Sequence, residues 1–208
     1  YWRLVDLYPP FDLKNYRINM EIPLEESMRN IILSRISYAQ DQINSHEDVH
    51  TLIHEIRKTV KRIRAVLKLI RDEIGYSNYY RENSFYRDLG RSLSGVRDSY
   101  VLGEVFSSLH ERFPDAMKEK DYEAITGTLT RKVERELSDF TEKKGGFDSI
   151  HRELDCASGR VEQYCRLRND FISMEKGIKR IYRRGSRYLS RVRKEFDTAE
   201  FHEYRKNT

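Results

Sequence analysis

The chain has 208 residues and a formal net charge of +5, and 35% of its residues are charged. Its length suits one sizeable domain or two small ones, and its 14 Tyr and 9 Phe supply enough apolar surface to build a core, which argues against disorder. Four Pro and ten Gly are too few for a loop-rich β fold, and no run of about 18 apolar residues is present that would cross a membrane.

The expected elements are helices separated by short breaks. Residues 1–23 contain three of the four prolines and should be irregular. From residue 24 onward, apolar residues recur at steps of three and four, which is typical of helices. The first two helices are expected over about 24–43 and 46–74, and the second should end at Gly75. The same pattern predicts helices over 79–95, 97–113, about 116–143, 149–175 and 176–197. The helices over 149–175 and 176–197 are either separate or joined into one long helix with an irregularity near Gly177. Another helix should start near residue 197.

No segment shows the alternation of apolar and polar residues that strands require. The sequence therefore predicts an all-α fold, an antiparallel helical bundle.

Positive charge is concentrated in two of these helices. Residues 54–71 carry seven bases and one acid, and residues 176–194 carry nine bases and no acid. Exposed helix faces usually mix Glu with Lys, because opposite charges four residues apart stabilise a helix and like charges destabilise it. The near absence of acids from both segments indicates a localised site for an anion or an acidic partner.

Each basic segment also carries an apolar face, which we expect to be buried. The face of the first segment comprises Leu52, Ile53, Ile56, Val60, Ile63, Leu67, Ile70 and Ile74. The face of the second comprises Ile178, Ile181, Tyr182, Tyr188, Leu189, Val192 and Phe196. Because both sets recur at helical spacing, the two helices should pack in the core through these faces and turn their bases outward.

A five-residue pattern occurs twice in the chain. His54-Glu55-Ile56-Arg57-Lys58 recurs as His202-Glu203-Tyr204-Arg205-Lys206, and each copy follows a short polar connection between helices. Repetition at this spacing implies two related halves. Residues 24–208 are therefore expected to form one domain with an internal pseudo-two-fold repeat, and its second half is expected to be incomplete, with the C-terminal part missing beyond Thr208.

Four segments resemble, in order, the motifs of the CHAD domain, the conserved histidine α-helical domain. They are residues 54–64, which open with His-Glu-Ile-Arg-Lys, residues 93–102 with Gly95 and Arg97-Asp98, residues 178–185 with Tyr-Arg-Arg-Gly, and residues 202–206. The chain departs from the family's pattern at Ser186, where another Arg is common, and it has one residue fewer between Gly95 and Arg97. The resemblance covers residues 50–206 and implies a helical bundle with two-fold pseudosymmetry and a basic central channel.

The resemblance also implies that this channel or groove binds inorganic polyphosphate. Arg offers phosphate oxygens a planar fork of N–H donors, Lys a mobile positive charge, and His a donor whose charge depends on pH. The residues expected to bind polyphosphate are His54, Arg57, Lys58, Lys61, Arg64, Arg97, Arg180, Arg183, Arg184, Arg187, Arg191, His202, Arg205 and Lys206.

Two other functions fit the same basic faces, namely nucleic-acid binding and the docking of an acidic protein partner by an adaptor. Against nucleic acid, Tyr182 and Tyr188 lie on an apolar face, where they should pack instead of stacking on bases. The sequence has neither a Gly-rich phosphate-binding loop nor an arrangement of a nucleophile with its base. We therefore expect neither an enzyme nor a cofactor.

One segment, His46-Glu47-Asp48-Val49-His50, matches the HExxH pattern of zinc proteases. It directly follows a helix break and places Asp48 where those enzymes have an apolar residue, so we expect no metal site. Cys156 and Cys165 fit neither zinc nor redox spacing, which favours a reducing cytoplasm. A polyphosphate ligand would place the protein at polyphosphate granules there, and no membrane partner is expected.

Overall fold

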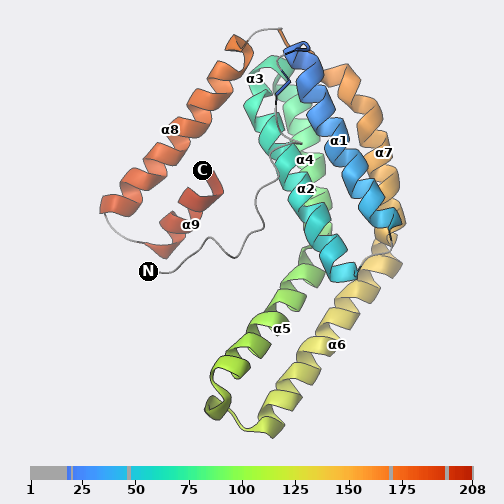
Figure 1. The fold of residues 1–208 in the computed structure, drawn as a ribbon, viewed down its shortest axis with the longest axis vertical. Coiled ribbons are helices and arrows are strands. Elements are labelled where there is room, and N and C mark those ends of the chain that lie inside the picture. Colours follow the sequence, from blue (N-terminus) through green and yellow to red (C-terminus); the bar gives the residue numbers. More distant parts are fainter. Residues whose placement is uncertain (1–17, 20, 46–47, 169–170, 195–196, 208) are drawn as a thin grey trace.

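The computed structural model describes residues 18–19, 21–45, 48–168, 171–194 and 197–207, and all regular structure within these ranges is helical (Figure 1). The predicted all-α fold class is thus confirmed. The helices are α1 (Leu24–Asn44), α2 (Val49–Leu69), α3 (Arg71–Ile74), α4 (Tyr76–Ser92), α5 (Ser94–Arg112), the 3₁₀ turn η2 (Pro114–Ala116), α6 (Glu119–Lys144), α7 (Gly146–Tyr164), α8 (Ile172–Lys194) and α9 (Thr198–Asn207). Within the described residues, no helix is long and apolar enough to cross a membrane.

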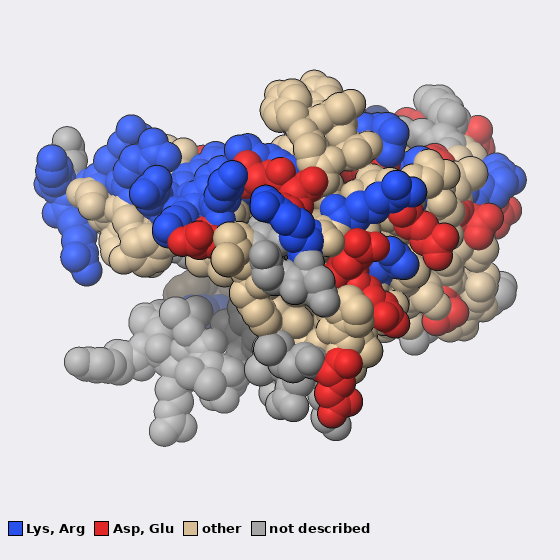
Figure 2. Space-filling model, turned by 90° about the horizontal axis from the view of Figure 1, so that it is seen from above, with Lys and Arg blue, Asp and Glu red and all other residues tan. Residues whose placement is uncertain are grey.

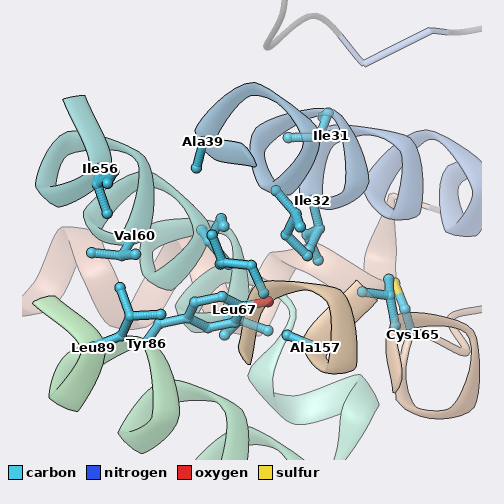
Figure 3. Packing of buried hydrophobic residues seen from close by; sticks show 14 of the residues in the cluster. Ile31, Ile32, Ala39, Ile56, Val60, Leu67, Tyr86, Leu89, Ala157 and Cys165 are labelled. Atoms are coloured by element: carbon cyan, nitrogen blue, oxygen red, sulfur yellow. The ribbon is translucent and has the colours of Figure 1, made fainter. Parts of the chain in front are cut away.

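The core lies between α1, α2, α4 and α7, which run side by side (Figure 1). Figure 3 shows apolar side chains from all four helices pointing toward one another, among them Ile32 of α1, Leu67 of α2, Tyr86 of α4 and Ala157 of α7. The apolar face predicted for residues 52–74 is confirmed, because every one of its eight side chains is buried. Packing of this face fixes the rotation of α2 about its axis and directs its basic face away from the core.

A buried ion pair also joins two helices of this bundle. Glu82 of α4 is completely buried, and its carboxylate accepts hydrogen bonds from Nε and Nη2 of Arg160 of α7 at 3.0 and 3.1 Å. Arg81 donates to the same carboxylate at 2.8 Å. Two donors from one guanidinium fix the geometry of both partners, so this pair holds α4 and α7 in register.

Two helix hairpins project from the bundle. The α5–α6 hairpin extends beyond the end at which α4 meets α5, and α6 returns to α7 (Figure 1). On the other side, α8 crosses α2 and α3 and then diverges from the bundle, and α9 folds back along α8. Both hairpins therefore expose more of their surface than the four central helices do.

The helix predicted over 46–74 is divided in the structure. Its first two residues, 46 and 47, lie outside the described range, and α2 ends at Leu69, with Ile70 between α2 and α3. The carbonyl of Lys68 accepts a hydrogen bond from Nη2 of Arg180 at 2.7 Å. A side chain that enters the backbone ladder in this way is a common cause of helix bending. The division between α2 and α3 therefore coincides with a contact from α8, a helix more than one hundred residues away in the chain.

The break predicted near Gly177 lies elsewhere. α7 ends at Tyr164 and α8 begins at Ile172, so Gly177 is inside α8 and buried. A Cβ atom at Gly177 would lie 1.9 Å from the carbonyl oxygen of Leu69. Glycine is therefore required here because two backbones approach closely, and it does not interrupt the helix.

The prediction that residues 178–196 bury their apolar face is wrong for two residues. Ile178 is 53% exposed and Tyr182 is 74% exposed. Ile181, Tyr188, Leu189 and Val192 are partly buried, and Phe196 lies outside the described residues. The physical reason is that α8 contacts α2 and α3 around Gly177 and Arg180, whereas its later part packs mainly against α9.

Candidate anion-binding surface

Lys and Arg side chains gather on one part of the molecule. Figure 2 shows them as a nearly continuous band toward the side where α8 projects, whereas acidic and basic side chains alternate over the opposite side. α8 supplies part of this band, since its last turn alone carries Arg191, Arg193 and Lys194. An uneven distribution of this kind produces a positive potential over one surface, although the net charge is small.

The basic face of α2 is a line of side chains that mostly lie three or four residues apart, which we call the α2 stripe. It comprises His54, Arg57, Lys58, Lys61, Arg64 and Lys68. At a rise of 1.5 Å per residue, the stripe is about 21 Å long. Its first four members line an open groove of about 470 Å³, whose other wall is formed by Arg97, Asp98 and aliphatic side chains of α5. The structure thus brings five of the predicted binding residues, the four from α2 and Arg97, to one concave site.

Two of the groove residues are held by specific contacts. Nη1 of Arg57 donates to the carbonyl oxygen of Gly90 and to Oγ of Ser94, both at 2.7 Å, which anchors the side chain at the junction of α4 and α5. Nζ of Lys58 lies 2.6 Å from Glu55, the single acid of residues 54–71. Because a guanidinium has five N–H donors and an ammonium three, an anion can share both groups with these partners.

The stripe contains mutually repelling charges. Burial and the neighbouring charges of Arg57 and Arg64 lower the pKa of Lys61. Burial also lowers the pKa of Arg64, with a contribution from the cationic Arg87 and Arg91. Each shift means that the positive form is less favourable here than in water, and a bound anion would relieve this repulsion.

His54 is affected in the same way. Burial and the positive charges of Arg97 and Lys58 lower its pKa below the ordinary value of 6.5. The imidazole is therefore more often neutral at neutral pH than a free histidine would be. Phosphates placed in the groove would reverse this shift, because an adjacent negative charge favours the imidazolium.

α8 meets the α2 stripe at its C-terminal end. Burial lowers the pKa of Lys68, with contributions from the positive charges of Arg64 and Arg184, so Arg184 of α8 acts on Lys68 electrostatically. Arg180 forms an ion pair with Asp72 and donates to the Lys68 carbonyl, so it fastens α8 to the end of α2. The predicted binding residue Arg180 thus positions the helix that carries Arg184.

The other predicted residues lie further out. Arg183, Arg187 and Arg191 are exposed along α8, and Arg191 lies 3.4 Å from Glu200 of α9. His202 and Arg205 are exposed on α9, and the side chain of Lys206 lies outside the described part of the structure.

Sequence reasoning omitted Lys68 from the binding residues, although its position seven residues after Lys61 places it on the same face. The omission matters because Lys68 is the residue at which the two basic helices approach each other.

The HExxH segment is only partly described, because His46 and Glu47 lie outside the described residues. The ring of His50 stacks on the ring of Tyr100, with centroids 3.8 Å apart. Among the residues that the structure describes, no three His, Cys, Asp or Glu side chains are grouped so that they would hold a metal ion.

Comparison with known proteins gives one match. A family model described as the CHAD domain matches residues 31–208. Among curated proteins and solved structures, nothing matches the chain.

Proposed function

The chain belongs to the CHAD domain family, and we propose that it binds inorganic polyphosphate along the α2 stripe. The observation that carries this proposal is the line of bases from His54 to Lys68, with Arg97 lining the same groove at one end and Arg184 of α8 acting electrostatically on Lys68 at the other. Glu55, the single acid within residues 54–71, forms an ion pair with Lys58. Polyphosphate is a linear anion with a negative charge on each internal phosphate, so a line of bases matches its shape as well as its charge.

The length of the stripe leads to an expectation about ligand size. Successive bases on one helix face recur about every 5–6 Å, and the whole stripe extends about 21 Å. Tripolyphosphate is too short to reach from His54 to Lys68, whereas a long chain contacts the whole stripe. Long-chain polyphosphate should therefore bind more tightly than tripolyphosphate, and the substitution Lys68→Ala should weaken the long chain more than the short one.

We propose binding without catalysis. The described residues that line the groove offer one carboxylate, Asp98, and no Ser, Thr or Cys side chain that would act as a nucleophile. The proposed location is the cytoplasm, where polyphosphate granules would be the site of action. Cys156 and Cys165 are free thiols in the structure, and thiols stay reduced in that compartment.

Single-stranded nucleic acid is the second candidate, because one argument against it does not hold in the structure. Tyr182 is 74% exposed and lies next to Arg183 on the basic helix α8. An exposed aromatic ring beside cationic side chains is the usual platform for stacking a base. Tyr76 and Tyr80 of α4 are also exposed.

A competition experiment decides between these ligands. Fluorescent long-chain polyphosphate is bound to the protein and displaced by unlabelled polyphosphate, single-stranded RNA, duplex DNA or polyglutamate at equal total charge. The proposal predicts that polyphosphate displaces the probe at the lowest concentration. If RNA displaces it equally well, and Tyr182→Ala weakens only RNA, nucleic acid is the better assignment.

A further inference from the structure

We propose that the outer face of α5 docks an acidic amphipathic helix of a partner protein. Five apolar side chains of this face are exposed, Val101 by 36%, Leu102 and Val105 by 49%, Leu109 by 51% and Phe113 by 52%. Four of them are spaced four residues apart, so they form one continuous ladder along the helix. We call these five side chains the α5 ladder.

The ladder has the dimensions of a helix-binding surface. From Val101 to Phe113 it extends about 18 Å, or slightly more than three helical turns. Ridges of side chains four residues apart are the ones that pack into the grooves of a second helix. A contiguous apolar face that is left open to water usually marks an interaction site. The complementary partner is therefore a helix of three to four turns with its own apolar face.

The adjoining charges specify the chemistry of that helix. Val101, Leu102 and Val105 form part of the wall of the 470 Å³ groove, whose lining also holds His54, the four bases Arg57, Lys58, Lys61 and Arg97, and one acid, Asp98, so that positive charge predominates. Polyphosphate has no apolar part, so the aliphatic wall contributes nothing that an anion of that kind would use. A ligand that matches both parts has aliphatic side chains next to carboxylates. The other end of the ladder also carries a base, Arg112, whose guanidinium lies 5.5 Å from the ring centre of Phe113.

A helix docked on the α5 ladder would place its acidic residues against Lys58, Lys61 and Arg97. These groups also belong to the proposed polyphosphate site, so the two ligands would compete for them. Polyphosphate would then release the partner helix, and the partner would occupy the groove when polyphosphate is scarce. The docking proposal itself rests on the α5 ladder and remains testable if the protein does not bind polyphosphate.

The test uses a synthetic helical peptide and the full 208-residue chain. The peptide has leucines on one face and glutamates at one end. One control peptide replaces the glutamates with lysines, and a second has the same composition in an order that destroys the apolar face. Binding is measured by fluorescence anisotropy for the unaltered protein, for Leu109→Asp, and for Ile125→Asp as the matched control. Ile125 is a 38%-exposed apolar residue of α6 that lies outside the groove.

The expected result is that only the acidic amphipathic peptide binds, and that Leu109→Asp weakens it by about tenfold or more, as for other central apolar anchors. Ile125→Asp should leave peptide binding unchanged, Arg97→Ala should weaken it, and Leu109→Asp should leave polyphosphate binding unchanged. Circular dichroism checks that each variant is folded.

Four results would overturn the proposal. The first is that the scrambled peptide binds as tightly as the acidic amphipathic peptide, and the second is that Leu109→Asp binds this peptide as tightly as the unaltered protein does. The third is that no peptide binds. The fourth is that Leu109→Asp affects only self-association or binding to anionic vesicles. In the last case, the ladder would be a surface for a second copy or for a membrane.

Discussion

Replacing Gly177 with Ala tests whether α8 crosses α2 as closely as the structure shows. An added Cβ would lie 1.9 Å from the Leu69 carbonyl oxygen and 2.8 Å from the carbonyl carbon. Both atoms belong to backbone, so neither can rotate away as the end of a side chain would. The two helices must therefore separate by about 1.5 Å to reach an ordinary contact distance. Gly159, within α7, is the matched control, because an added Cβ there meets nothing within 4 Å.

The two substitutions should change stability in different directions. Alanine in place of glycine stabilises a helix interior by about 0.5–1 kcal/mol, and Gly159→Ala should show this gain in its free energy of unfolding. Gly177→Ala receives the same gain but is opposed by overpacking, which costs about 1–3 kcal/mol. The difference between the two variants therefore isolates the clash. Separation of the helices should also move Arg184 away from Lys68 and weaken long-chain polyphosphate binding.

Urea unfolding followed by circular dichroism gives the two free energies, and amide hydrogen exchange shows whether α8 has been released from the bundle. We expect faster exchange in α8 for Gly177→Ala and unchanged exchange in α1 and α2. If Gly177→Ala is as stable as Gly159→Ala and exchange in α8 is unaltered, the close crossing of α8 over Leu69 is refuted. The account of how the two basic helices meet would then fail with it.

Three further predictions concern single groups. Glu82→Gln should lower the free energy of unfolding by about 1–3 kcal/mol in urea titrations, because it weakens the charge-assisted hydrogen bonds from Arg160 and Arg81, which both keep some contact with solvent. A loss well below about 1 kcal/mol would show that the pair contributes little to stability. The folded protein holds a proton on His54 less tightly than the unfolded chain does, so the free energy of unfolding should fall as the pH drops below about 6.5. His54→Gln should make this dependence of stability on pH weaker. Polyphosphate binding should strengthen over the same pH range, and an unchanged affinity there would show that His54 is not part of the site. Burial raises the pKa of Cys165 to about 11, whereas Cys156 is exposed. A thiol reagent at pH 8 should therefore label Cys156 quickly and Cys165 only after unfolding. Rapid labelling of both would mean that the core around Cys165 opens readily.

The sequence predicts those parts of the fold that depend on local pattern. The apolar period of residues 52–74 identifies a buried face correctly because every side chain on it packs against neighbours in the same bundle. Pro114 and Gly75 also mark real helix ends, since α5 ends at Arg112 and α3 ends at Ile74. In each case the cause of the structure lies within a few residues of its effect.

Features that depend on distant parts of the chain could not be predicted. Glycine often marks a helix break in a sequence. Only the position of Leu69 shows that Gly177 instead lies where the backbones of α8 and α2 approach each other closely. Tyr182 lies on an apolar helix face, yet it is exposed because α8 leaves the bundle. The basic faces were evident from the sequence, but the contact of Arg180 with the Lys68 carbonyl depends on how α8 crosses α2.

The internal repeat remains a prediction. Each five-residue copy begins in the second turn of its helix, after an aspartate, Asp48 or Asp197, whose carboxylate accepts a backbone N–H at the helix start. This shared arrangement agrees with two related halves. Superposition of residues 24–64 on residues 178–206 tests it, and failure of the two helix–link–helix units to overlay would make the repeat coincidental.

The most direct test of the polyphosphate site is the salt dependence of binding in two variants of equal charge. One replaces Lys61, Arg64 and Lys68 of the α2 stripe with Ala, and the other replaces Arg131, Lys132 and Arg135, which are exposed on α6. Helicity should be retained in both, because Ala is the best helix former. Loss of three charge-assisted contacts should weaken binding by several kcal/mol, at about 1.5–3 kcal/mol each without strict additivity. It should also make the slope of log affinity against log salt concentration shallower by about 2, as counterion release at single-stranded polyanions requires. We predict both effects for the α2 variant and neither for the α6 variant, whereas equal losses of affinity and slope in the two variants would contradict a site on α2.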